Sequence, residues 1–429
     1  MSVSAHLAGE AQRILRDNDT GRFIKPSPKQ YPHQWNWDAA LIALGLATFD
    51  LERARAEVRT LLEGQWKDGM VPHIVYHDGP SDYFPTPDFW RSERSAAAPS
   101  VPTSGLTQPP VLATAVRAIV ERDPDQGAAL TFLREVYGKL LAWHRWFYAA
   151  RDPEGSGVVA LIHPWESGMD NSTRFTGALA RLTPTDVPTF RRRDQQHVAA
   201  DERPVAGDYE RFMYLIGLYR DWRWDPEALF ERAPFLIRDA FTTAILHRAN
   251  EDLLELATSL GEPTEEIAGW LARTRAGYSA LWDEAAGLYF DLDLRAGAPV
   301  REDTCATFLA LYAGLASEAQ AARLAEHLRD PDAYAPDART RFYLPSAAKS
   351  SPYFEPRRYW RGPVWLNINW FLVQGLRRYG YAALAERVVN DTLSLVARSG
   401  FAEYYDPRDG SPCGARDFSW SAALVLELL

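Results

Sequence analysis

Several segments of this chain place carboxylate side chains directly beside aromatic rings. The segment Phe401-Ala-Glu-Tyr-Tyr-Asp-Pro407 is followed by Ala415-Arg-Asp-Phe-Ser-Trp420. Three further segments share this character: Tyr31-Pro-His-Gln-Trp-Asn-Trp-Asp38, His163-Pro-Trp-Glu-Ser-Gly-Met-Asp-Asn-Ser172 and Arg358-Tyr-Trp-Arg-Gly-Pro-Val-Trp365. Aromatic faces cover the C–H faces of a pyranose, while carboxyl groups bind its hydroxyls and supply the acid and base that break a glycosidic bond. The sequence therefore predicts a glycosidase.

The segment 163–172 offers two candidates for the general acid, Glu166 and Asp170. Gly168 indicates an irregular loop, which can present a carboxyl group to a cavity. Near the ring of Trp165 and with little water, such a group can have a raised pKa and stay protonated near neutrality, as a general acid must. The alternative is that Asp170 caps a turn or helix, and the residues alone favour neither interpretation.

Glu403 is the better candidate for the general base. Its segment is expected to be extended and to project Glu403 and Tyr405 to one face. Asp406 begins a turn-like Asp-Pro-Arg-Asp-Gly stretch, so its expected role is turn formation. An inverting glycosidase holds its two carboxyl groups about 6.5–9.5 Å apart and a retaining one about 5–5.5 Å apart, a separation that the sequence does not reveal.

Trp35, Trp37 and Asp38 come just before an expected helix. Asp38 either caps that helix, with a favourable dipole interaction, or holds sugar hydroxyls above a floor shaped by a Trp ring. Core packing is the default role of an isolated Trp. Several Trp residues beside acids favour a sugar site instead.

Apolar residues recur at helical spacing through most of the chain, which predicts an all-α protein. Pro and Gly fall between the helices, which favours antiparallel pairs with short connections. The expected helices are Ala5–Arg16, Asp38–Thr48, Leu51–Lys67, Ala128–Tyr148, Tyr209–Tyr219, Ile237–Leu260, Glu265–Trp282, Thr304–Leu315, Ser317–Leu328, Val364–Tyr379, Tyr381–Ser399 and Trp420–Leu429.

Two Pro-rich stretches break the helical pattern, at residues 68–110 and 161–204. Long ordered loops are usually functional, and we expect these two to form a lid that closes over substrate. No linker or charge block divides the chain, and one site would need segments from its middle and both ends. We therefore expect one catalytic domain, residues 1–429, built as an (α/α)6 barrel. Two helical domains are the structural alternative.

The composition excludes several classes of protein. The content of 46% hydrophobic and 24% charged residues is typical of a globular protein, and the net charge of -10 argues against nucleic acid or an anionic membrane as partner. The first twenty or so residues lack the apolar run of a signal peptide, and no stretch approaches the roughly 20 apolar residues of a membrane span. Because Cys305 and Cys413 have neither metal-ligand spacing nor the density of a disulfide scaffold, we expect a cytoplasmic protein with reduced thiols.

Motifs for other chemistries are missing from the sequence. There is no HExxH pair, and His73 and His77 lie in a Pro- and Gly-flanked segment, so no metal is expected. A GxSxG elbow, a P-loop and a GxGxxG motif opening a βαβ unit are also absent. A mechanism based on two carboxyl groups needs no cofactor.

In the pieces that carry acids and aromatic rings, the chain resembles glycoside hydrolase family 63, particularly its small bacterial members of the mannosylglycerate and glucosylglycerate hydrolase type. The pieces span almost the whole chain and occur in order. They are Gln34-Trp-Asn-Trp-Asp38, Trp165-Glu-Ser-Gly-Met-Asp-Asn-Ser172, Tyr359-Trp-Arg-Gly-Pro-Val-Trp365, Glu403-Tyr-Tyr-Asp-Pro407 and Gly414-Ala-Arg-Asp-Phe-Ser-Trp420.

The resemblance implies an (α/α)6 barrel with a lid and an inverting mechanism. In this interpretation Asp170 protonates the leaving oxygen and Glu403 activates water. Arg203 and Tyr209 are the candidates for binding a glycerate carboxylate, which needs a cation and hydroxyl donors. The sugar would be bound by Tyr31, Trp35, Trp37, Asp38, Gln108, Trp165, Gly168, Tyr359, Trp360, Trp365 and Trp420.

The leading hypothesis is hydrolysis of a small α-glycoside, 2-O-mannosylglycerate or its glucosyl analogue. The alternative is a sugar epimerase or isomerase, since similar helical toroids host that chemistry, although its usual His bases are not in the strongest motifs. A noncatalytic sugar-binding protein is the third hypothesis. A small glycoside is the expected partner, and the sequence is compatible with a homo-oligomer without determining one.

Overall fold

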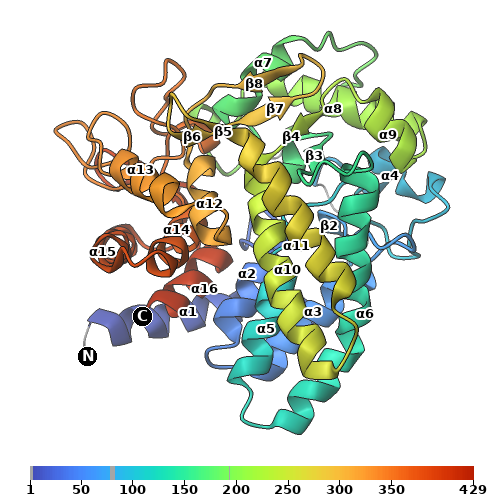
Figure 1. The fold of residues 1–429 in the computed structure, drawn as a ribbon, viewed down its shortest axis with the longest axis horizontal. Coiled ribbons are helices and arrows are strands. Elements are labelled where there is room, and N and C mark those ends of the chain that lie inside the picture. The colour runs from blue at the N-terminus through green and yellow to red at the C-terminus, as the bar shows by residue number, and fades with distance from the viewer. Residues whose placement is uncertain (1–2, 78–82, 193) are drawn as a thin grey trace.

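The computed structural model describes residues 3–77, 83–192 and 194–429. Within them, six helices form a closed inner ring, in which each helix contacts the next and the last contacts the first. Figure 1 shows this ring below a cap of loops, strands and further helices. The inner helices are α2 (Asn36–Leu46), α5 (Leu112–Arg122), α10 (Ala240–Leu260), α12 (Leu309–Ala313), α14 (Leu366–Arg378) and α16 (Ser419–Leu428).

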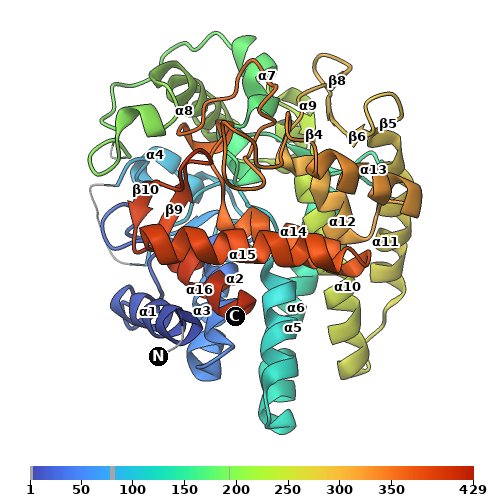
Figure 2. The same ribbon diagram turned by 90° about the vertical axis from the view of Figure 1, so that its left-hand side faces the viewer.

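Six further helices of the described chain alternate with these along the sequence and lie outside the ring (Figures 1 and 2). This alternation of inner and outer helices makes the fold an (α/α)6 barrel, so the predicted all-α toroid is confirmed. The outer helices are α1 (Val3–Asp17), α3 (Leu51–Glu63), α6 (Gln126–Arg151), α11 (Glu265–Tyr278), α13 (Glu318–Leu328) and α15 (Ala382–Ser399).

Burial explains which helices take the inner positions. Every residue of α2 is buried, as expected for a helix that is apolar all round. In contrast, α1 buries only one stripe, made of Leu7, Ala11, Ile14 and Leu15. Small residues let inner helices approach closely, because a Cβ added at Gly45 of α2 would lie 2.3 Å from a backbone atom of α16.

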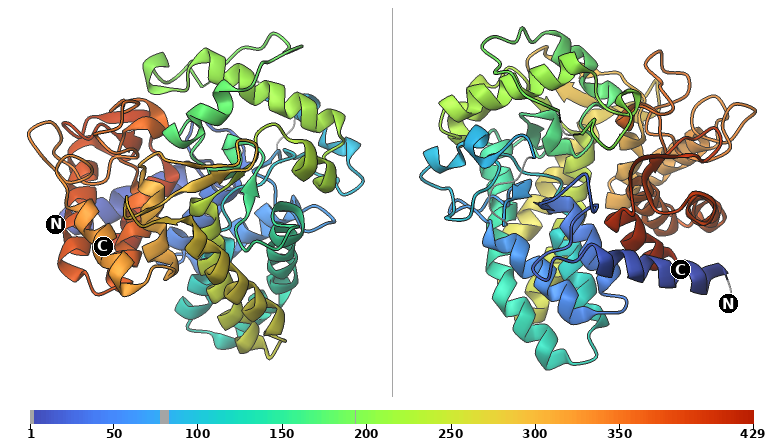
Figure 3. Two further views of the ribbon diagram at one scale, coloured as in Figure 1. Left: turned by 45° about the horizontal axis from the view of Figure 1, so that its top comes forward. Right: turned by 180° about the vertical axis from the view of Figure 1, so that it is seen from behind.

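The two ends of the chain pack against each other. Helix α1 contacts α16, and both labelled termini lie on the same side of the molecule (Figures 1 and 3). The Asn18 side chain joins the two ends further, because its amide donates to the Asp417 carbonyl at 2.8 Å and to the Ser419 hydroxyl at 2.9 Å. The last inner helix thereby closes the ring against the first.

One end of the ring carries the cap (Figure 1, top). It contains an antiparallel sheet of order β3-β4-β7-β8 together with four helices. These elements are β3 (Ala160–Leu161), β4 (Ile237–Arg238), β7 (Asp291–Asp293), β8 (Ala298–Val300), α4 (Pro87–Trp90), α7 (Thr176–Ala180), α8 (Ala206–Asp221) and α9 (Pro226–Arg232).

The remaining elements are short. Strand pairs β1–β2, β5–β6 and β9–β10 are antiparallel. Their bounds are β1 (Gln34–Trp35), β2 (Ile74–Val75), β5 (Trp282–Asp283), β6 (Leu288–Tyr289), β9 (Ala402–Tyr405) and β10 (Pro412–Arg416). The 3-10 helices are η1 (Ser92–Arg94), η2 (Pro164–Ser167), η3 (Thr173–Phe175), η4 (Ala200–Glu202), η5 (Ser279–Leu281), η6 (Cys305–Phe308) and η7 (Tyr359–Arg361).

The expected helices all occur, with differences at their ends, but four of the described helices were not predicted: α4, α5, α7 and α9. The segment expected as a helix from Ile237 begins as strand β4, and the helix starts at Ala240. Helices α4, α7 and α9 have only four to seven residues, too few for a clear helical pattern. Helix α5 was missed although its apolar residues do recur at helical spacing. No described helix has the length and apolar character to cross a membrane.

The two segments expected to form a lid contribute to the cap end. Residues 78–82 and 193 of these segments lie outside the described residues. The remainder of 68–110 contains β2, α4 and η1, and the remainder of 161–204 contains η2, η3, α7 and η4. Both segments supply side chains to the cavity described next.

Candidate active site

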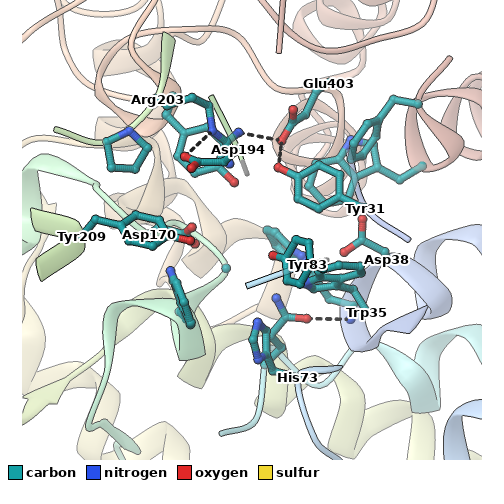
Figure 4. Close-up of a pocket in the computed structure, with 18 residues that line it drawn as sticks. Tyr31, Trp35, Asp38, His73, Tyr83, Asp170, Asp194, Arg203, Tyr209 and Glu403 are labelled. Carbon is teal, nitrogen blue, oxygen red and sulfur yellow. Dashed lines mark hydrogen bonds and ion pairs between the residues drawn. The ribbon is translucent and has the colours of Figure 1, made fainter. Parts of the chain in front are cut away.

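A cavity lies where the inner helices begin, beneath the cap, and draws residues from both ends and the middle of the chain (Figure 4). Asp38 is in the first turn of α2, and Trp420 is in the first turn of α16. The lining residues are Tyr31, Trp35, Trp37, Asp38, His73, Tyr83, Gln108, Trp165, Gly168, Asp170, Asp194, Arg203, Pro204, Tyr209, Tyr359, Glu403, Phe418 and Trp420.

All but two of the predicted site residues line this cavity. Trp360 and Trp365 do not, since they form a buried layer behind it, with parallel rings whose centroids are 3.7 Å apart. The indole of Trp365 donates to the backbone carbonyl of Tyr359 at 3.0 Å. Their expected place on the sugar site is corrected to a supporting one, because a Trp-rich motif does not reveal which rings face the cavity and which pack behind it.

The cavity also contains residues that sequence reasoning missed: His73, Tyr83, Asp194, Pro204 and Phe418. Phe418 lies inside one of the acid–aromatic motifs and could have been included for that reason. His73 was considered only as a metal ligand, yet its ring stacks on Trp165 at 5.6 Å and burial holds its pKa well below the usual value. A neutral imidazole can form a hydrogen bond with a sugar hydroxyl.

Asp38 does not cap the helix that follows it. Helix α2 begins at Asn36 with Trp35 at the N-cap, and no side chain makes a cap hydrogen bond. Burial raises the pKa of Asp38 well above its usual value, and the charges of Glu403 and Asp170 add to the effect. Among the described residues no side chain donates to this carboxyl, so its oxygens can meet sugar hydroxyls.

The structure separates the two candidate acids of segment 163–172. Glu166 is buried away from the cavity and forms an ion pair with Arg151, 2.6 Å from Oε1 to Nη2. Its Oε2 accepts from the backbone of Ile162 at 3.0 Å. Glu166 is therefore an anchor of the loop, and Asp170 is the carboxyl group of this segment that faces the cavity.

Asp170 lies on a loop shaped by close packing. Gly168 has a φ of +71°, and a Cβ there would lie 2.6 Å from the ring of Trp37. Burial raises the pKa of Asp170 to about 7, against the opposing influence of the Arg203 guanidinium. No described side chain donates a hydrogen bond to it. Asp170 can therefore hold a proton near neutrality.

Glu403 is held far more firmly. It projects from β9, where its Oε1 accepts from the Tyr31 hydroxyl at 2.8 Å and from Arg203 Nη1 at 3.4 Å. Its Oε2 accepts from the Ala415 backbone amide at 2.9 Å. Burial raises the pKa of Glu403, but Arg203, the Ala415 amide and Tyr31 all favour its ionised form. The predicted extended conformation around Glu403 is confirmed.

Arg203 links the acidic groups at the cap side of the cavity (Figure 4). Its Nε lies 3.3 Å from Asp194 Oδ2, and its guanidinium lies 4.0 Å from the ring centroid of Tyr359. Burial alone would raise the pKa of Asp194, but Arg192 and Arg203 hold that pKa below its usual value. A buried guanidinium in this position can bind an anionic group of a ligand.

The arrangement can therefore hydrolyse a glycoside. Asp170 and Glu403 approach the cavity from different sides (Figure 4), one in surroundings that retain a proton and the other in surroundings that favour the anion. Aromatic rings and the carboxyl of Asp38 line the same cavity, where they can bind a sugar. General acid–base cleavage of a glycosidic bond needs these parts.

Comparison with known proteins agrees with this site. The family model of the mannosylglycerate hydrolase MGH1-like glycoside hydrolase domain matches residues 31–421. The chain is 47% identical to a mannosylglycerate hydrolase of Thermus thermophilus, over 97% of this chain and 99% of the relative. It is 37% identical to a glucosylglycerate hydrolase of Mycolicibacterium hassiacum, over 99% of this chain and 97% of that one.

The fold is similar over the same extent. A crystal structure of a family 63 mannosylglycerate hydrolase from Thermus thermophilus, in complex with Tris and D-glycerate, superimposes with a TM-score of 0.93 at 46% identity. The match covers 98% of this chain and 99% of the other. These relatives are hydrolases, and they give no support to the alternative of a sugar epimerase or isomerase. The chain belongs to the mannosylglycerate hydrolase MGH1-like glycoside hydrolases of glycoside hydrolase family 63.

Proposed function

We propose that the protein hydrolyses 2-O-(α-D-mannosyl)-D-glycerate, or its α-D-glucosyl analogue, to the free sugar and D-glycerate with inversion at the anomeric carbon. The observation that carries this proposal is the contrast between the two carboxyl groups of the cavity. Asp170 has a pKa raised to about 7 and no described side-chain donor, whereas Glu403 accepts from a hydroxyl, a guanidinium and a backbone amide. The names of the relatives support the substrate.

In this mechanism Asp170 is the general acid and Glu403 the general base. Asp170 gives its proton to the glycosidic oxygen as the bond to the anomeric carbon breaks. Glu403 takes a proton from a water molecule, and the resulting hydroxide attacks the opposite face of the sugar. The water supplies the oxygen of the new anomeric hydroxyl, and glycerate leaves with the proton from Asp170.

The sugar lies among the aromatic and polar residues of the cavity floor. Asp38 and Gln108 accept hydrogen bonds from its hydroxyls, although Gln108 Oε1 already accepts from the Trp37 amide at 3.2 Å. Rings cover its C–H faces. The proposed sugar contacts are Tyr31, Trp35, Trp37, Asp38, Gln108, Trp165, Gly168, Tyr359 and Trp420, with Trp360 and Trp365 supporting them from behind.

Arg203 and Tyr209 bind the glycerate carboxylate in this proposal. Both line the cavity, and Arg203 contacts the proposed base, with Nη1 3.4 Å from Glu403 Oε1. The carboxylate would take a donor position of Arg203 that faces the cavity, and the Tyr209 hydroxyl would donate to it. A charge-assisted contact of this kind favours an acidic aglycone over a neutral one.

We further propose that residues 1–429 act as one catalytic domain and that segments 68–110 and 161–204 close over substrate as a lid. The cavity supports both proposals, because it takes residues from the whole chain and from both segments. We also propose a cytoplasmic location, which the two buried free thiols support. Protection of the two segments from proteolysis by substrate is the expected sign of closure.

The test is proton NMR of the purified protein with a panel of mannosylglycerate, glucosylglycerate, trehalose and kojibiose. Initial release of the β-anomer from one of the two glycerates would establish both the substrate and inversion. Initial α-anomer would contradict the inverting mechanism, and release only from trehalose or kojibiose would contradict the glycerate substrate.

A further inference from the structure

The hairpin of β9 and β10 has an irregularity beside Glu403. Tyr404 pairs with Cys413 and Ala402 with Arg416, so the two residues 414 and 415 stand opposite Glu403 alone. Such a bulge bends the strand and turns a backbone group out of the regular pairing. Here it aims an amide at the Glu403 carboxylate, 2.9 Å from Oε2.

Glycine is required at the first bulge position. Gly414 has a φ of +69°, and a Cβ there would lie 2.5 Å from Glu403 Oε2 and 2.5 Å from the ring of Tyr404. The proposed base therefore depends on a backbone conformation of Gly414 that must itself be held in place.

Glu202, at the end of η4, holds this bulge from the cap side. Its Oε2 accepts from the Gly414 amide at 2.9 Å, and its Oε1 forms an ion pair with Arg357. Its backbone carbonyl accepts from the Tyr404 hydroxyl at 2.6 Å. The Glu202 side chain is only 10% exposed. One residue of the cap thus contacts both strands of the hairpin.

Arg357 extends these contacts to the turn between the strands. Its Nη1 lies 2.9 Å from the Ser411 hydroxyl and 3.4 Å from Asp406 Oδ2. Glu202 and Arg357 together therefore fix the bulge and the turn relative to the cap. We call this pair the hairpin clamp.

The hairpin clamp also affects the position of Arg203, the residue after Glu202. Arg203 follows it directly, about 3.8 Å away along the backbone, and contacts Glu403 at 3.4 Å. The Arg203 carbonyl accepts from Arg358 at 2.8 Å. A displaced Glu202 would shift both Arg203 and the amide beneath Glu403.

We infer that Glu202 and Arg357 are positioning residues, which hold the Ala415 amide beneath Glu403 and the backbone of Arg203 in one fixed arrangement. Neither lines the described cavity, so each acts through another residue. The inference rests on the proposed function, in which Glu403 activates water and Arg203 binds the aglycone carboxylate. The clamp then couples the chemistry to recognition of the acidic aglycone.

The test compares E202Q and R357Q with R408Q in the full-length protein. Arg408 is a matched control because it also pairs with Asp406, at 2.7 Å, but is 51% exposed and contacts neither Glu202 nor Gly414. The measurements are kcat on mannosylglycerate, which reports Glu403, and the Kd of D-glycerate by titration calorimetry, which reports Arg203.

We expect E202Q and R357Q each to lower kcat about tenfold and to raise the Kd of D-glycerate by a similar factor, the size expected for removal of one charge-assisted hydrogen bond. R408Q should match the unaltered protein in both. The effects of the two substitutions should not add in the double variant, because each one already breaks the Glu202–Arg357 ion pair that the clamp depends on. A fall in binding stoichiometry at unchanged Kd would indicate misfolding alone and would overturn the inference, as would additive effects.

A crystal structure of E202Q tests the clamp without activity. We expect the 2.9 Å hydrogen bond between the Ala415 amide and Glu403 to be broken while the barrel is unchanged. An intact hydrogen bond would overturn the inference even if the protein hydrolysed no glycerate glycoside. The proposed function could also fail while the clamp is correct. In that case the unaltered protein would show no turnover, but in the E202Q structure the Glu403 carboxylate would still have moved away from the Ala415 amide.

Discussion

The loop that carries Asp170 and the hairpin that carries Glu403 hold their carboxyl groups in opposite ways. Glu403 accepts from a hydroxyl, a guanidinium and a backbone amide, all of which favour its anion. Asp170 has no described side-chain donor, and burial keeps its pKa at about 7. Two similar functional groups thus acquire different chemistry from the number of donors around them.

The largest expected effect comes from removing either carboxyl group. Asp170→Asn and Glu403→Gln should each lower kcat by about 10²–10⁴-fold, the usual contribution of general acid or base catalysis. Circular dichroism and melting temperature should stay close to those of the unaltered protein. Turnover near the original rate in either variant would remove that residue from the mechanism.

The next effect is on stability, and it tests how the acid loop is anchored. Glu166→Gln leaves the Arg151 charge buried without its partner and should cost about 3–5 kcal/mol of unfolding free energy in urea titration. Glu266→Gln is the matched control, since Glu266 pairs with Arg145 on the surface at 2.6 Å. Exposed pairs contribute about 0–1 kcal/mol, so a loss of equal size in both variants would contradict an anchoring role for Glu166.

The sequence predicted the barrel and most of the proposed site because both depend on local patterns. Helical periodicity predicted the outer helices and most inner ones. The acid–aromatic segments offered Glu166, Asp170, Glu403 and Asp38 as candidates, and the resemblance to family 63 selected Asp170 as the acid. The sheet β3-β4-β7-β8 was missed, since strands of two or three residues are too short for an alternating pattern. Asp194 was missed for a different reason, because its place in the cavity depends on how the cap folds over the barrel.

A smaller effect should follow from removing a single donor to Glu403. Tyr31→Phe takes away the 2.8 Å hydrogen bond, which raises the pKa of Glu403 because its anion loses a partner. Glu403 must be ionised to act as a base. The acid limb of the pH–activity profile should therefore lie at a higher pH in Tyr31→Phe than in the unaltered protein. The alkaline limb, where Asp170 loses its proton at about pH 7, should not move.

The measurement is kcat/KM against pH, with a loss of about tenfold at the acid end for one charge-assisted hydrogen bond. Tyr334→Phe is the control. The Tyr334 hydroxyl also donates to a carboxylate, that of Asp303 at a distance of 2.7 Å, but neither residue lines the cavity. A shift of the alkaline limb instead of the acid limb would reverse the assignment of acid and base.

The smallest expected effect compares one hydroxyl in each region. The Ser167 hydroxyl donates to Pro164 at 2.6 Å and accepts from the Met169 amide at 2.9 Å, just before Asp170. The Ser421 hydroxyl donates to Ala402 of the hairpin at 2.7 Å. Each alanine variant should cost about 1 kcal/mol of unfolding free energy.

The two variants should differ in activity. Ser167→Ala should also lower kcat a few-fold, because no described side chain restrains Asp170. Ser421→Ala should leave kcat unchanged, because three donors still hold Glu403. Equal losses of kcat in the two variants would mean that the acid loop is as firmly positioned as the base hairpin.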